Sequence, residues 1–149
     1  MKLIIGSDHA GFQLKEQIKK CLSKKGFQLE DVGTDSEESC DYPDFAAKVA
    51  KKVQKTKNLG IVICGTGIGA CITANKFRGI RAALCKDEFA AKLAREHNDA
   101  NILCLGGRTT NPEQAKKIVD AFLSAQPSKE PRHIARVNKI SAIEKDNFK

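Results

Sequence analysis

The chain has 149 residues, of which 41% are hydrophobic, and its 26 lysines and arginines against 18 acidic residues give a formal net charge of +8. This length suits one hydrophobic core, so we expect a single domain over 1–149. No stretch has the length of a membrane-spanning helix, and the first residues lack the pattern of an export signal. The lysines recur at helical spacing and few aromatics are available to stack on bases, so we expect neither a membrane nor a nucleic acid as partner.

Strand and helix patterns alternate along the chain. Strands are predicted at 2–6, 27–32, 60–64, 80–84 and 101–105. Helices are predicted at 12–25, 43–53, 68–77, 88–96 and 112–123. Alternation of this kind predicts an α/β fold in which helices cover both faces of a five-stranded parallel sheet. The polar segment 126–131 contains two prolines and is predicted to link this sandwich to a C-terminal helix at 132–147, whose apolar residues repeat every third position.

The six cysteines are scattered, mostly at apolar positions, and no two form a CxxC pair. The three histidines are far apart in the sequence. These spacings favour free thiols in a reducing cytoplasm over a disulfide framework, and they predict no metal site.

The segment 59–70 is the most informative part of the sequence, because an apolar strand ends in Cys64 and continues into a glycine-rich turn. Parallel sheets bind ligands at the carboxyl ends of their strands, so Cys64 lies at a ligand-binding edge. Backbone N–H groups of such a turn can surround an anion and favour a thiolate. Two alternatives stay open: a buried core cysteine, or a loose dinucleotide fingerprint G-x-G-x-x-A starting at Gly65.

Two further loops lie at the same edge of the predicted sheet. Asp8 and His9 follow the first strand and could bind a sugar hydroxyl and a phosphate. Helix capping is the alternative explanation for Asp8. Tyr42 stands before Pro43, beyond the second strand, and could cover a ligand or simply belong to the turn that enters the next helix.

A second set of candidates lies elsewhere. His97 ends a predicted helix just before the last strand, at the amino edge of the sheet, so it could join a Cys64 site only from another subunit. The alternative is a histidine favoured by the helix dipole. Arg132 and Arg136 share one helix face and could grip a phosphate together with Arg108, although an exposed arginine pair is more often solvated.

The motifs that carry these candidates span nearly the whole chain, in order: 6–11, 41–45, 63–69, 75–81, 97–101, 106–108 and 132–136. Together they resemble the type B ribose-5-phosphate isomerases. The resemblance implies interconversion of ribose 5-phosphate and ribulose 5-phosphate, without a metal or cofactor, on a Rossmann-like sheet. It also implies dimers or tetramers whose active sites are shared between subunits. An isomerase of a six-carbon sugar phosphate (galactose 6-phosphate or allose 6-phosphate) and a nucleotide-binding Rossmann module are the alternatives.

The resemblance also implies a role for each candidate. Cys64 is the base that moves a proton between C1 and C2, and His97, with Thr66 close by, opens the furanose ring. The phosphate is held by His9, Arg108, Arg132 and Arg136. The rest of the substrate, including the enediolate, is bound by Asp8, Tyr42, Gly65, Gly67, Ile68, Gly69 and Asn98. Some relatives use a glutamate at the position of Ala70 as base, and galactose-6-phosphate isomerase subunits tend to lose the ring-opening histidine or the Asp-His pair that this chain keeps.

Overall fold

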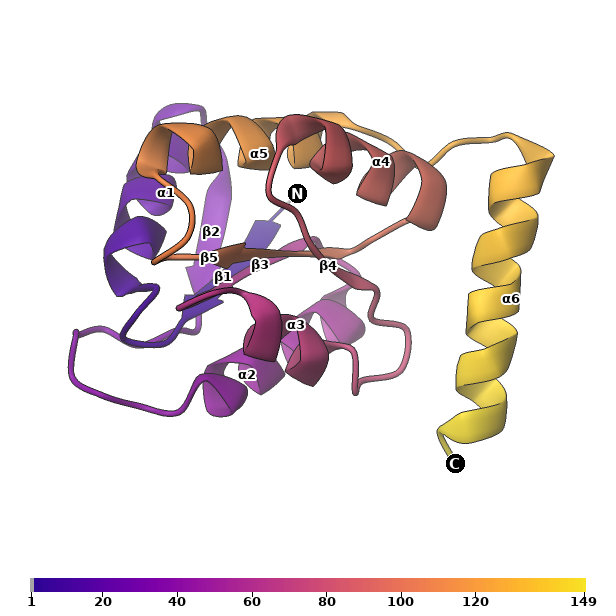
Figure 1. Cartoon of the computed structure of the whole chain (residues 1–149), viewed down its shortest axis with the longest axis horizontal. Coiled ribbons are helices and arrows are strands. Elements are labelled where there is room, and N and C mark those ends of the chain that lie inside the picture. Colours follow the sequence, from indigo (N-terminus) through magenta and orange to yellow (C-terminus); the bar gives the residue numbers. More distant parts are fainter. Residues whose placement is uncertain (1) are drawn as a thin grey trace.

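A computed structural model, which describes residues 2–149, shows one five-stranded sheet covered by helices on both faces (Figure 1). The strands are β1 (Lys2–Ser7), β2 (Gln28–Asp31), β3 (Gly60–Cys64), β4 (Ala82–Leu84) and β5 (Ile102–Gly106). The helices are α1 (Phe12–Lys24), α2 (Tyr42–Thr56), α3 (Ile68–Ala74), α4 (Glu88–Asn98), α5 (Pro112–Ser124) and α6 (Pro131–Asn147). The predicted α/β three-layer sandwich with a C-terminal helix is confirmed. Within residues 2–149, no helix is both long and apolar enough to cross a membrane.

The strand order creates a place where a ligand can bind in the middle of the sheet. The order is β2-β1-β3-β5-β4 and every pair is parallel, with Ile5 beside Ile61 and Ile63 beside Leu105. The chain leaves β1 toward one edge of the sheet and leaves β3 toward the other. The carboxyl ends of β1 and β3 therefore form the switch point at which open parallel sheets bind their ligands.

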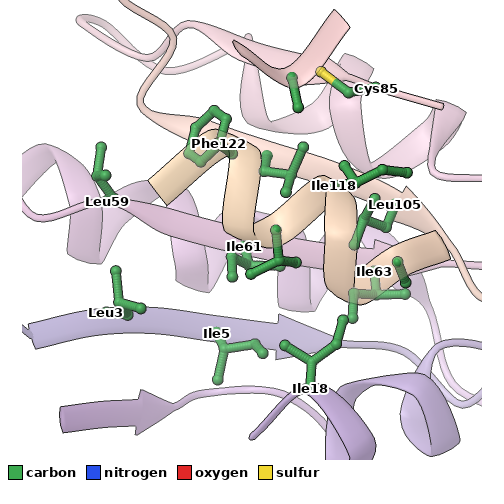
Figure 2. Packing of buried hydrophobic residues seen from close by; sticks show 14 of the residues in the cluster. Leu3, Ile5, Ile18, Leu59, Ile61, Ile63, Cys85, Leu105, Ile118 and Phe122 are labelled. Atoms are coloured by element: carbon green, nitrogen blue, oxygen red, sulfur yellow. The ribbon is translucent and has the colours of Figure 1, made fainter. Parts of the chain in front are cut away.

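Alternate residues of each strand pack into two different cores. On one face, Ile5 of β1 and Ile61 of β3 are fully buried against α1 and α5. Figure 2 shows Ile118 and Phe122 of α5 above these strands and Ile18 of α1 beside Ile5. Side chains alternate between the two faces of a strand, and both faces are buried here, so the strands are continuously apolar in the sequence. In the helices only every third or fourth residue faces the core, which gives their amphipathic pattern.

The opposite face of the sheet holds the cysteine of interest. Ile4, Val62 and Cys104 pack there against α2 and α3, with Val49 of α2 fully buried. Cys64, the last residue of β3, belongs to this second core and is 3% exposed. Its side chain therefore lies between the sheet and the two helices that flank the glycine-rich turn.

The connection from α3 to β4 differs from the prediction. α3 ends at Ala74 instead of residue 77, and β4 begins at Ala82 instead of residue 80. The Asn75 side chain binds the backbone of Ala82 twice, as donor to its carbonyl (2.9 Å) and as acceptor from its N–H (2.8 Å). Gly79 has φ +73°, which an ordinary helical residue rarely adopts. This side-chain clamp and the left-handed glycine replace the last helical turn.

The C-terminal helix α6 lies along one side of the sandwich, outside its layers, and contacts it at α4 (Figure 1). It begins at Pro131, which sits in its first turn as the preference for proline predicts. Near its end, Glu144 accepts a hydrogen bond from the Gly79 N–H at 2.9 Å. Ile140 and Ile143 remain exposed on this helix. α6 thus presents an apolar face that the described residues only partly cover.

Candidate active site

The turn after β3 folds back onto the sulfur of Cys64. Gly67 has φ +79°, and this left-handed conformation brings its N–H to 3.2 Å from Cys64 Sγ. The Thr66 hydroxyl accepts a hydrogen bond from the Ile68 N–H at 3.3 Å. The turn therefore directs a backbone donor at the atom that would carry negative charge if the thiol ionised.

The beginning of α3 continues this donor-lined turn. The first backbone bond of the helix runs from the Cys71 N–H to the Gly67 carbonyl at 3.0 Å, so the N–H groups of Gly69 and Ala70 have no helical carbonyl to bind. A Cβ on Gly69 would lie 2.5 Å from the Tyr42 ring. Glycine is thus required there because the aromatic ring packs directly against the backbone of the turn.

The loops after β1 and β5 are tied to the same turn. The Gly107 N–H binds the Cys64 carbonyl at 2.7 Å, and the Arg108 N–H binds the Gly65 carbonyl at 2.9 Å. Asp8, 5% exposed, accepts a hydrogen bond from the Gly11 N–H at 3.0 Å, so it stabilises the turn into α1 while it lines the same cavity. The turn-capping and ligand-binding interpretations of Asp8 are therefore compatible.

His9 is oriented by a residue that the sequence analysis did not single out. Its Nδ1 accepts the Cys40 N–H at 3.2 Å, and the Cys40 sulfur lies 3.8 Å from the same nitrogen. A neutral imidazole with an acceptor at Nδ1 carries its proton on Nε2. His9 is thus prepared to donate from Nε2 to an anion. Cys40 lies in an irregular loop, where no periodic pattern could have identified this contact.

These loops enclose one cavity of about 770 Å³. Nine of the predicted site residues line the cavity: Asp8, His9, Tyr42, Cys64, Gly65, Thr66, Ile68, Gly69 and Arg108. Gly67 lies in the same turn. Three strands contribute their carboxyl ends, so the parallel topology explains why residues from distant parts of the sequence meet here.

The other predicted site residues do not reach this cavity. His97 and Asn98 lie at the end of α4, and Arg132 and Arg136 are exposed on α6. His97 instead lines a cavity of about 180 Å³ between α4 and α6, together with His133. The candidates therefore form two groups in one chain: a cysteine group at the carboxyl edge of the sheet, and a histidine and arginine group where α4 meets α6.

The dinucleotide alternative is not favoured by the geometry after β4. Asp87 would be the acidic residue available to a ribose hydroxyl in that interpretation. Instead, Asp87 is the N-cap of α4 and accepts the Ala90 N–H at 2.7 Å. Within residues 2–149, no group of three or more histidines, cysteines or acidic residues is arranged to hold a metal ion.

Three cysteines other than Cys64 differ in the acidity of their thiols. A hydrogen bond with Cys104 lowers the pKa of Cys71 to about 7, against the opposing effect of burial. Burial raises the pKa of Cys85 to about 11. The bond with Cys71, together with burial, raises the pKa of Cys104 well above its ordinary value. Cys71 is therefore the member of this trio that ionises near neutral pH.

This difference predicts the order of alkylation in the native protein. At about pH 7.5, iodoacetamide is expected to modify Cys71 well before Cys85 or Cys104, because only the thiolate reacts. Peptide mass spectrometry over a time course measures the order. A Cys71→Ser variant serves as control, and burial of Cys85 and Cys104 should keep both unmodified at early times in this variant as well. Modification of Cys85 ahead of Cys71 would contradict the assigned acidities.

Comparison with known proteins identifies the family. Residues 3–140 match the family model described as Ribose/Galactose Isomerase. The chain is 48% identical over 144 residues to "Ribose-5-phosphate isomerase B" of Escherichia coli, with 96% of each chain covered. It superposes on the Clostridium thermocellum Ribose-5-Phosphate Isomerase B structure with TM-score 0.95 and 51% identity, covering 98% and 99% of the two chains. The Mycoplasma genitalium enzyme with bound ribulose-5-phosphate gives TM-score 0.92 and 45% identity, with 98% and 97% covered. The chain therefore belongs to the ribose/galactose isomerase family.

Proposed function

We propose that this protein interconverts D-ribose 5-phosphate and D-ribulose 5-phosphate by proton transfer through an enediolate. The observation that carries the proposal is the cysteine group: a thiol that accepts a backbone N–H bond, beside a donor-lined turn, in a cavity with Asp8, His9 and Arg108. The bound ribulose-5-phosphate of the Mycoplasma genitalium relative supports the substrate class.

Cys64 acts as the base in this mechanism. Its thiolate removes the hydrogen at C2 of the ring-opened aldose, the C–H electrons form the C1–C2 double bond, and the carbonyl electrons move onto O1. A proton then passes from O2 to O1, and Cys64 returns a proton to C1 to give the ketose. Ala70, where some relatives place a glutamate, has no group that could take this proton. Cys64 lies at the edge of a water-poor core, which suits a base that must keep its proton between the two steps.

The intermediate has two anionic groups, the enediolate and the phosphate, and each is bound at a separate place. Charge develops on O1 and O2, and the N–H groups at the beginning of α3, together with Asn98, stabilise it there. Asp8 holds sugar hydroxyls, and the Tyr42 ring covers the turn. The phosphate is bound by His9 and Arg108, with further charge from the arginines of α6.

We further propose that the active unit is a homodimer, alone or within a tetramer, in which each site combines both groups of residues. His97 opens the furanose ring with Thr66 close by, and Arg132 and Arg136 bind the phosphate. The four residues of the histidine and arginine group, His97, Asn98, Arg132 and Arg136, all come from a second copy. Two observations support this arrangement: the histidine group lies away from the Cys64 cavity, and large apolar side chains are exposed near both groups. These exposed side chains are Ile68, Ile72, Leu84, Phe89, Ile134, Ile140 and Ile143.

A reducing, cytoplasmic location completes the proposal. All six cysteines are free thiols, including the proposed base. Oxidation of Cys64 would remove the group that accepts the C2 proton. A compartment that keeps thiols reduced is therefore where this chemistry can persist.

One assay tests the proposed function. Purified protein is supplied with ribose 5-phosphate, and ribulose 5-phosphate formation is followed in a coupled assay with and without EDTA. We expect the same turnover in both conditions, because the proposed steps use only protein groups. Loss of activity with EDTA that added metal restores would contradict the metal-free mechanism. Turnover of galactose 6-phosphate but not of ribose 5-phosphate would contradict the proposed substrate.

A further inference from the structure

One histidine of the terminal helix makes a contact that the proposed mechanism leaves unexplained. The beginning of α6 lies beside the end of α4 (Figure 1), and there the rings of His97 and His133 are stacked. Their centroids are 3.9 Å apart and their planes differ by 10°. His133 is 6% exposed and is the buried residue of an otherwise exposed helix. α6 therefore places its one buried polar ring directly on the ring-opening histidine.

The stack restricts how the His97 ring can turn. Rotation about the bond that joins an imidazole to its Cβ is soft, so the ring plane is set by what touches it. Among the described residues, hydrogen bonds hold the ring of His9, and no such bond holds the ring of His97. The face-to-face contact with His133 is thus the feature that holds the plane of His97, and turning the ring would break close packing on its whole face.

Burial and the charges around the pair favour the neutral form of His133. Burial lowers the pKa of His133, and positive charge at its neighbours, when His97 is protonated and from Arg132 and Arg136, lowers it further, while Glu130 opposes the effect. Glu96 of α4 and Asp99, the C-cap of that helix, line the same small cavity as the two histidines. A neutral His133 can stay stacked while His97 gains and loses a proton, whereas a charged His133 would repel a protonated His97.

We propose that His133 is a positioning residue, whose stacked ring holds the His97 imidazole in the plane from which it opens the sugar ring. This inference rests on the proposed function, and it assigns a specific step to a residue outside the cavity of the cysteine group.

The experiment separates ring opening from proton transfer. Turnover of ribose 5-phosphate, which is largely a closed furanose, needs both steps. Ribulose 5-phosphate cannot close a furanose because its O5 carries the phosphate, so exchange of its C1 hydrogen with D2O needs only the Cys64 step. The variants are His133→Ala, which removes the ring, and His133→Phe, which keeps a flat ring without charge. Asn138→Ala is the control, since Asn138 lines the same small cavity.

The expected result is a split between the two readouts. His133→Ala lowers kcat/KM for ribose 5-phosphate roughly 10- to 100-fold, as small misplacements of catalytic groups do, while C1 exchange stays within about threefold of wild type. His133→Phe recovers most of the turnover, and Asn138→Ala changes neither readout. Equal losses of turnover and exchange in His133→Ala, no loss of either, or no recovery in His133→Phe would each overturn the inference. Absence of both activities in the wild-type protein would instead refute the proposed function.

Discussion

Replacement of Cys64 by alanine is expected to lower the turnover of ribose 5-phosphate by at least about 10³-fold, because no other group in the cavity stands in the same position to move a proton between C1 and C2. Asp8 and His9 are already engaged by Gly11 and Cys40. The other two carboxylates of the lining, Asp41 and Asp44, are exposed to solvent at the beginning of α2, whereas Cys64 is buried. The coupled assay measures the loss directly, at substrate concentrations that separate kcat from KM.

A neighbouring cysteine provides the matched control for this variant. Cys104 lies on β5 in the same core as Cys64 and is fully buried. Cys104→Ala removes a sulfur of the same size and should cost about 1 kcal/mol of stability while most turnover remains. Both variants should keep the circular dichroism spectrum and a cooperative melting transition. Substantial turnover in Cys64→Ala would reject Cys64 as the base.

The second large effect is expected from mixing two inactive proteins. If each site takes Cys64 from one chain and His97 from another, a heterodimer of Cys64→Ala and His97→Asn chains holds one site with both defects and one intact site. Random exchange makes half of the dimers mixed, so activity should recover to about a quarter of wild type. The measurement is ribose 5-phosphate turnover after subunit exchange under mild denaturant, followed by dilution.

Two observations decide whether this recovery means shared sites. Native mass spectrometry of the mixture must show the heterodimer, and each variant treated alone must stay inactive. A mixture in which heterodimers are present but activity does not return would contradict the assignment of the two groups of residues to different chains. It would leave the histidine group without a route to the Cys64 cavity.

The fold and the cysteine group could be predicted because both follow from local patterns and one topological rule. Apolar runs of strand length alternate with amphipathic helices, and parallel strands bring their carboxyl ends together. Asp8 and Arg108 each follow a strand and Cys64 ends one, so their meeting needed no knowledge of side-chain packing. The end of α3 was predicted wrongly, since it depends on Asn75 reaching Ala82, seven residues away, which periodicity does not reveal.

Two contacts of the candidate site lay beyond sequence reasoning. The bond from Cys40 to His9 depends on the path of an irregular loop. The stack of His133 on His97 depends on how the segment between α5 and α6 turns, and there the Ser128 N–H binds the Glu96 carbonyl at 2.8 Å. Neither of these two loops has a repeating sequence pattern, so their conformations depend on packing and not on local secondary-structure propensity. The arrangement of two chains around one site is likewise a property of surfaces, not of local sequence.

Hydrogen exchange at C1 of ribulose 5-phosphate tests the central claim most directly, because it isolates the proton transfer assigned to Cys64. The protein is incubated with the ketose in D2O, and loss of the C1 proton signal is followed by NMR for wild type, Cys64→Ala and His97→Asn. We predict exchange by wild type and by His97→Asn, and none above background by Cys64→Ala. Exchange by Cys64→Ala at the wild-type rate would contradict the account.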